Sequence, residues 1–204
     1  MVVPVVADAD TLFGATTRGL LIHLDYQGLI RLHWSALILD EMSRALVDTG
    51  RKPDRAAATK HEALMRAALP QAEVPMGDVQ AHFEAVAWAM RSAKDTHVAA
   101  CAHVLPTQHY YPETPVVSLV TKNVRDFAVK KLATLGIDVQ RPDAFLLKLI
   151  TENETGVAGA FAALRVTLRS APTPEQLLKR LAADGQTETA AALLALRQAG
   201  TAAL

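Results

Sequence analysis

The sequence predicts an α/β fold, in which a central parallel sheet is covered by helices and followed by an all-helical C-terminal extension. Short apolar, β-branched runs alternate with helical patterns up to residue 142, and strands separated by helices favour a parallel sheet. From residue 143 onward every periodic segment is helical and rich in alanine and leucine. We therefore expect two domains, residues 1–142 and 143–204.

Strands and helices alternate through the first half of the chain. Residues 2–7 are predicted to form a buried strand, and a helical pattern follows over 18–26. The alternation of apolar residues over 29–34 indicates a second strand, after which Ser35 is a suitable N-cap for a helix over 36–47. Three more helices are expected over 54–69, 79–91 and 96–105.

The clearest strand of the sequence covers residues 116–120, and it ends at the polar Thr121. A helix over 124–135 and a short strand over 137–139 complete the alternation. The C-terminal helices are expected over 143–153, 155–169, 174–183 and 186–198, with glycine and proline at their breaks.

Composition and charge exclude several classes of protein. The 204 residues are 50% hydrophobic, and 21 Lys and Arg balance 21 Asp and Glu, which excludes a mainly disordered chain and a protein that coats nucleic acid by bulk charge. The longest uncharged apolar stretch, residues 156–164, is about half of the roughly 20 residues that a membrane-spanning helix needs. With a single cysteine, Cys101, and no signal-peptide pattern, we expect a cytoplasmic protein.

Acidic residues occur where a parallel sheet binds ligands, beyond the carboxyl ends of its strands. Asp8 and Asp10 follow the first strand, and Asp126 follows the clearest later one. Glu41 shares a helix face with apolar residues, and Asp95 begins a helix. Carboxylates that converge raise one another's pKa, and a bound divalent ion relieves this repulsion. Ligation by oxygen alone suits Mg²⁺ or Mn²⁺ rather than zinc.

Each acid also has a purely structural interpretation. Asp95 is a favoured N-cap residue, and Asp126, in the first turn of the helix expected over 124–135, would stabilise the helix dipole. Glu41 could lie at the rim of an apolar stripe, while Asp8 and Asp10 could form an Asx turn.

The ordered set of motifs resembles a PIN-domain ribonuclease, in particular a VapC-type toxin. The motifs are VVADADTL at 5–12, SALILDE at 35–41, KDTHVAA at 94–100 and LVTKNVRDF at 119–127. The resemblance covers about residues 2–142, and the helical tail is similar to the C-terminal domain of some VapC-like proteins. It implies a PIN-like, three-layer α/β/α nuclease domain that hydrolyses RNA phosphodiester bonds.

The resemblance also implies roles for particular residues. Four acids match the acidic quartet of the family: Asp8, Glu41, Asp95 and Asp126. Asp8, Asp95 and Asp126 would hold Mg²⁺ (or Mn²⁺), with Glu41 as a ligand or as the orienter of the attacking water. Supporting roles fall to Asp10, Ser35, Thr121 and Asn123. Two of these depart from the family pattern, because Asp10 stands where Asn is frequent and Asn123 where many members have an acid.

An RNA substrate requires cations for its phosphates. Lys122 and Arg125 are the candidate RNA-binding residues, since they flank the proposed site together with Lys130 and Lys131. A second basic patch over 51–66 has a solvated helix face as its alternative. We interpret His97 as a surface histidine rather than an acid–base catalyst. The resemblance further implies a cognate antitoxin and a homodimer.

Two other functions compete with the ribonuclease interpretation. The Asp8–x–Asp10 spacing and the later Thr121 also occur in phosphatases of the haloacid-dehalogenase type, but the late acidic pair of that family is missing. A catalytically inert PIN-like module that binds a partner protein would lack divalent-dependent cleavage altogether.

Overall fold

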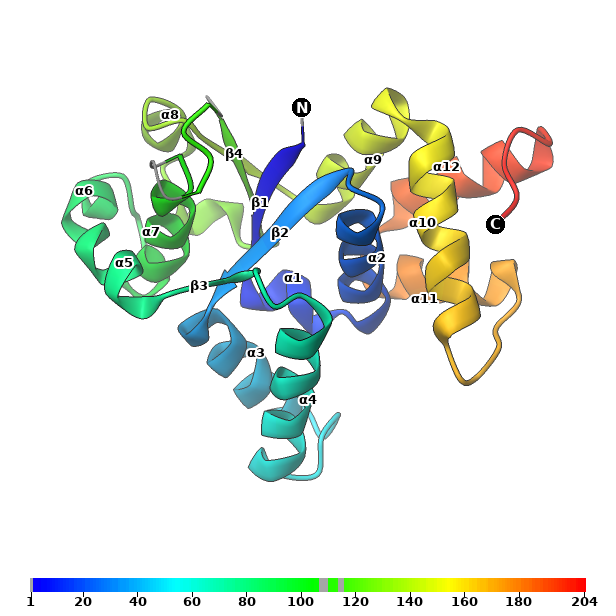
Figure 1. Ribbon diagram of the computed structural model, residues 1–204, viewed down its shortest axis with the longest axis horizontal. Coiled ribbons are helices and arrows are strands. Elements are labelled where there is room, and N and C mark those ends of the chain that lie inside the picture. The colour runs from blue at the N-terminus through cyan, green and yellow to red at the C-terminus, as the bar shows by residue number, and fades with distance from the viewer. Residues whose placement is uncertain (1, 107–109, 114–115) are drawn as a thin grey trace. The chain divides into compact units, whose positions relative to one another are not determined.

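A five-stranded parallel sheet with flanking helices forms the centre of the computed structural model, which describes residues 2–106, 110–113 and 116–204 (Figure 1). The strands are β1 (Val3–Ala7), β2 (Ile30–Ser35), β3 (Glu73–Val74), β4 (Val117–Val120) and β5 (Ile137–Gln140). Their order in the sheet is β3-β2-β1-β4-β5. The predicted α/β class with a helical C-terminal region is confirmed.

Contacts divide the chain into two compact units. The first contains residues 3–13 and 31–140, and therefore nearly all of the sheet. The second contains residue 2, residues 14–30 and residues 141–204. Helix α2 (Ala15–Tyr26), which follows the first strand in the sequence, thus belongs with the C-terminal helices.

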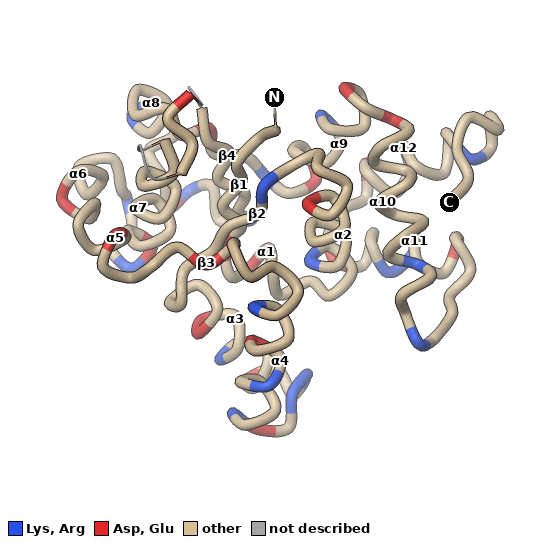
Figure 2. Tube along the Cα trace, in the orientation of Figure 1, with Lys and Arg blue, Asp and Glu red and all other residues tan. Residues whose placement is uncertain are grey.

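The remaining helices of the sheet unit are α1 (Ala9–Phe13), α3 (Ala36–Asp48), α4 (Arg55–Ala68), α5 (Met76–Ala81), α6 (Phe83–Ala87), α7 (Thr96–Val104) and α8 (Val129–Ala133), with 3-10 turns η1 (Ala93–Asp95) and η2 (Val124–Asp126). Ser35 caps α3 as predicted, because its hydroxyl accepts from the backbone N–H of Ile38 at 3.4 Å. Basic and acidic positions are interspersed along the trace, in agreement with the zero net charge (Figure 2).

The register of β1 against β4 positions the candidate site. Ala7 lies beside Val120, so the residues that follow them, Asp8 and Thr121, leave the sheet at the same edge. Residues 5–7 of β1 and residues 119 and 120 of β4 are completely buried. A strand that is buried on both faces has a continuous apolar sequence. Each fully buried Val or Leu stabilises the fold by about 1.5–3 kcal/mol.

Two expected helices are interrupted, and tertiary contacts explain one of the interruptions. The helix expected over 124–135 is replaced by η2 and the shorter α8, because Phe127 between them is extended and pairs with Met90 in an antiparallel bridge. The side chain of Phe127 is completely buried. The helix expected over 79–91 is instead split between α5 and α6.

The two-residue β3 precedes α5 and lies between the helices expected over 54–69 and 79–91, where the sequence predicted no strand. It pairs with the end of β2, where Glu73 lies beside Trp34 and Val74 beside Ser35. Such a short edge strand carries no periodic signal that a sequence pattern could reveal.

The second unit consists of α2 with α9 (Pro142–Glu152), α10 (Glu154–Thr167), α11 (Pro174–Ala183) and α12 (Thr187–Gln198). Asp184 caps α2 from a distant part of the sequence, since its Oδ2 accepts from the N–H groups of Thr16 and Thr17 at 2.8 and 2.9 Å. Gly19 permits close packing of α2 on α10, because a Cβ at that position would lie 2.8 Å from Leu164 Cδ1. Within the described residues, no helix is both long and apolar enough to cross a membrane.

Candidate active site

The carboxyl ends of β1 and β4 bring Asp8, Asp10 and Thr121 into one hydrogen-bonded cluster. The hydroxyl of Thr121 donates to Asp8 Oδ2 at 2.8 Å and lies 3.3 Å from Asp10 Oδ2. The backbone N–H of Lys122 faces both carboxylate oxygens of Asp10, at 3.0 and 3.1 Å. The N–H of Asn123 donates to the Thr121 hydroxyl at 3.1 Å. A single turn after β4 therefore orients both acids that follow β1.

Asp8 lies in surroundings that oppose its negative charge. Burial raises the pKa of this carboxyl to about 7, and the neighbouring charges of Asp10 and Asp95 add to the effect. Hydrogen bonds from Thr121 and from the N–H of Ala9, which is 2.6 Å from Asp8 Oδ1, act in the opposite direction but are outweighed. Burial likewise raises the pKa of Asp10. The pair therefore favours either a bound proton or a bound cation.

Asp95 supplies a second buried carboxylate besides Asp8, at the junction of η1 and α7. Its side chain is 8% exposed, and it makes no capping hydrogen bond to α7, so the simple N-cap interpretation is wrong. Its Oδ2 atom is buried without a hydrogen-bond partner among the described residues. An isolated buried carboxylate oxygen is costly, and a proton or a cation would remove the cost.

Glu41 on α3 faces His97 on α7. His97 Nε2 lies 3.4 Å from Glu41 Oε2, and His97 Nδ1 donates to the carbonyl of Lys94 at 2.9 Å. Burial by itself lowers the pKa of His97, but the interactions with Glu41 outweigh it and raise the pKa above its usual value. The ring is 5% exposed, so the expected surface position of His97 is wrong; the cause is that α7 is buried on nearly all sides.

The remaining predicted site residues, and the side chain of Glu41, differ in how exposed they are and in whether they contact the acids after β1. The side chain of Glu41 is one-third exposed, so it connects the cluster with solvent. Asp126 lies in η2, where its backbone carbonyl accepts from the N–H groups of Arg91 and Ser92 at 2.9 and 3.2 Å. Among the described residues, no hydrogen bond or ion pair joins the Asp126 carboxylate to the acids after β1. Asn123 and Arg125 are exposed.

The donor set fits a hard divalent cation. In the described part of the chain, no three His, Cys, Asp or Glu side chains are close enough to form a complete metal site. However, Asp8 interacts electrostatically with both Asp10 and Asp95, and the buried Oδ2 atom of Asp95 has no hydrogen-bond partner among the described residues. Because all of these donors are carboxylate oxygens, Mg²⁺ or Mn²⁺ fits their chemistry better than zinc does.

Comparisons with known proteins concern the C-terminal helices. Residues 142–195 match the family VapC50_C, described as the VapC50 C-terminal domain. A search of curated proteins and a search of solved structures each found no match. The matched region runs from α9 into α12, so the predicted helical tail is similar to a domain of VapC-related proteins.

Proposed function

We propose that this protein is a metal-dependent endoribonuclease of the VapC type and the toxin of a type II toxin–antitoxin pair. The observation that carries the proposal is the group of carboxylates at the carboxyl edge of a parallel sheet: the buried Asp8 and Asp95 and the half-buried Asp10. The similarity of residues 142–195 to the VapC50 C-terminal domain supports the same class of protein.

Asp8 and Asp95 would hold Mg²⁺ or Mn²⁺, with Asp126 as the third acid that the family resemblance implies. When bound, the ion would neutralise charge on the scissile phosphate and lower the pKa of a water molecule. Thr121 keeps the Asp8 carboxylate oriented through its 2.8 Å hydrogen bond. Asp10 would stabilise the turn after β4 by accepting from the backbone of Lys122.

Glu41 is the residue best suited to receive a proton from the attacking water. Its side chain is one-third exposed to solvent, whereas Asp8 and Asp95 are buried. His97 positions Glu41 from the inner side, and the hydrogen bond to the Lys94 carbonyl fixes its ring. Lys122 and Arg125 would contact substrate phosphates. A cognate antitoxin, a homodimer and a cytoplasmic location belong to the same proposal.

Cleavage of a labelled single-stranded RNA tests this function. The purified protein should cut the RNA with Mg²⁺ or Mn²⁺ and should lose this activity in EDTA. Asp8→Asn and Asp95→Asn should abolish cleavage and relieve growth arrest on expression, because both replacements remove a charged oxygen. Asp48→Asn, an exposed position at the end of α3, is the matched control and should remain active. Cleavage that persists in both site variants would disprove the assignment.

A further inference from the structure

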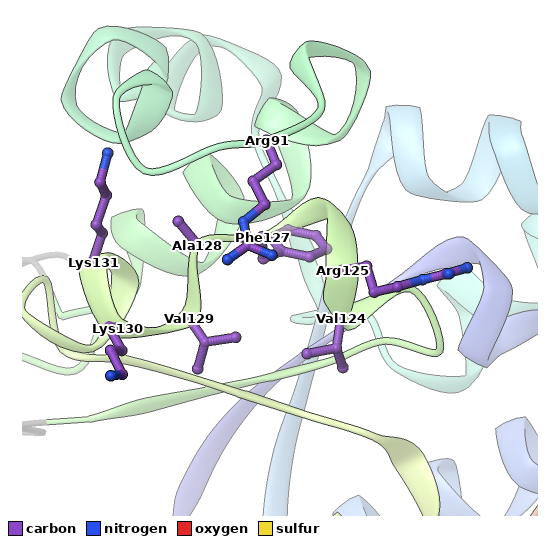
Figure 3. Close-up of a pocket in the computed structure, with 8 residues that line it drawn as sticks. All are labelled: Arg91, Val124, Arg125, Phe127, Ala128, Val129, Lys130 and Lys131. Atoms are coloured by element: carbon purple, nitrogen blue, oxygen red, sulfur yellow. The ribbon is translucent and has the colours of Figure 1, made fainter.

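A basic cavity adjoins η2 in the sheet unit. Its volume is about 510 Å³, and four basic residues line it together with apolar ones (Figure 3). Arg91 extends into it from the segment after α6, whereas Arg125, Lys130 and Lys131 come from η2 and α8. Val124 and Val129 provide apolar wall. Among the described residues, no acidic side chain lines the cavity.

The positive charges at this cavity have no acidic partner in the part of the chain that the structure describes. In the described part of the chain, Arg91, Arg125 and Lys130 form no ion pair. Lys131 donates to the carbonyl of Trp88 at 2.9 Å and lies 5.3 Å from the centre of its ring. A cluster of cations without carboxylate partners attracts an anionic ligand.

The second basic patch, over 51–66, differs in this respect. Arg55 pairs with Asp40, and Arg66 pairs with Glu62 and with Glu73, the latter at 2.6 Å. Two of the five Lys and Arg residues of this patch thus already have carboxylates to bind, which reduces the unpaired charge that it offers to a phosphate. The contrast favours the cavity as the place where the sheet unit binds an anion.

Two of the segments that line the cavity are close in sequence to residues of the acid cluster. Val124 is three residues after Thr121, so their Cα atoms lie at most about 11 Å apart, given about 3.5 Å per residue. Arg91 is four residues before Asp95, and its N–H donates to the Asp126 carbonyl at 2.9 Å. The wall of the cavity at Val124 therefore lies close to the turn that holds Asp8 and Asp10.

We propose that this cavity binds a nucleotide of single-stranded RNA that flanks the cleaved bond, with Arg91 and Lys130 contacting its phosphate. The proposal rests on the proposed ribonuclease function and adds a binding subsite to it. Unpaired cations match the phosphate, and the apolar wall formed by Val124 and Val129 matches the sugar and base.

The test measures the affinity of a fluorescent ten-nucleotide single-stranded RNA in EDTA, over a series of salt concentrations. Arg91→Gln and Lys130→Gln should each weaken binding and reduce the slope of log K against log salt by about 0.7, the value for one lost phosphate contact on a single strand. The controls are Arg169→Gln and Lys148→Gln, which remove exposed charges from the helical unit and should leave the slope unchanged. Equal melting temperatures establish that all variants are folded.

Each outcome bears on the cavity separately from the nuclease. Unchanged slopes in both cavity variants of an RNA-cleaving protein would overturn the cavity assignment and leave the nuclease intact. Reduced slopes in a protein that cleaves no RNA would support the cavity and reject the proposed catalysis. A decaglutamate peptide that binds more tightly than the RNA, and loses affinity in Arg91→Gln, would assign the cavity to an acidic protein partner and overturn the proposal.

Discussion

Thr121 at the end of β4 donates a hydrogen bond to Asp8 at the end of β1, over 2.8 Å and between positions 113 residues apart in the sequence. The same hydroxyl is 3.3 Å from Asp10 and accepts from the N–H of Asn123. Because a hydroxyl has only one proton to donate, the shorter contact identifies Asp8 as its main acceptor. The relationship links the pairing of two strands to the orientation of the acid on which the proposed catalysis depends.

Replacing Thr121 by Val should impair this site without changing its shape. The hydroxyl is completely buried, so its loss leaves the Asp8 oxygen and the Asn123 N–H without their partner. We expect a loss of stability of about 1–3 kcal/mol in urea denaturation and a clear fall in kcat for RNA cleavage. Thr121→Ser restores the donor and should recover most of both properties. Equal activity of the Val and Ser variants would contradict the role of the hydroxyl.

The buried Asp8 carboxyl should make the metal-free protein less stable as the pH rises. Its pKa is about 7 in the folded protein, against 3.8 for an unperturbed Asp, so the folded state binds the proton more tightly. This contribution to stability is complete below pH 3.8 and is lost progressively as the pH rises to about 7. The loss is about 1.4 kcal/mol for each pKa unit between the two states.

Urea denaturation in EDTA at pH 5 and pH 8 measures this effect. Asp8→Asn carries no titrating group, so its stability relative to the wild type should be greater at pH 8 than at pH 5. A difference that does not change with pH would show that Asp8 is already ionised in the folded protein.

Divalent cations should stabilise the folded protein, in a manner that is independent of catalysis. Ligand binding to the native state adds RT ln(1 + [L]/Kd), which is about 2.7 kcal/mol at a concentration 100 times the Kd. We expect Mn²⁺ to raise the melting temperature of the wild type and to have little effect on Asp95→Asn, which loses a charged ligand. An equal rise in Asp48→Asn and Asp95→Asn would indicate binding elsewhere.

The helical unit should depend on the long-range cap that Asp184 provides. Its carboxylate accepts from two N–H groups at the start of α2, where the preceding Gly14 offers no side chain. Asp184→Ala should therefore destabilise the protein by about 0.5–2 kcal/mol in urea denaturation, as loss of an N-cap does. Asp184→Asn keeps an acceptor and should cost less. The exposed Glu152→Ala serves as the control and should have little effect.

Deletion of the C-terminal helices should destabilise the protein, because α2 packs on them. Removing residues 143–204 would delete α10 and α11, on which α2 packs, and would expose Leu20, Leu21 and Leu24, which are buried in the full chain. We expect such a truncation to lower stability or solubility, so single substitutions are the better probes of the helical unit. A truncated protein as stable as the full chain would show that α2 needs no partner.

The sequence predicted the regular elements best where their periodicity is strong. The C-terminal helices match their expected ranges to within two residues at each end, and the strand before Thr121 differs by one. The prediction from the sequence failed where long-range contacts override local preference. Phe127 lies in an expected helix, yet pairing with Met90 and complete burial hold it extended. His97 was expected at the surface because one apolar helix face is usual, whereas α7 is buried on nearly all sides.

By itself, the sequence determined the α/β class, the helical tail and the acidic positions that follow the strands, because apolar periodicity and strand ends are local properties. Only the tertiary structure decided which of these residues meet: Thr121 with Asp8, His97 with Glu41, and Arg91 with the cavity beside η2. It also placed α2 with the C-terminal helices rather than with the sheet. The physical reason is that a periodic pattern specifies which face of an element is buried, but strand register and side-chain packing select the partner that buries it.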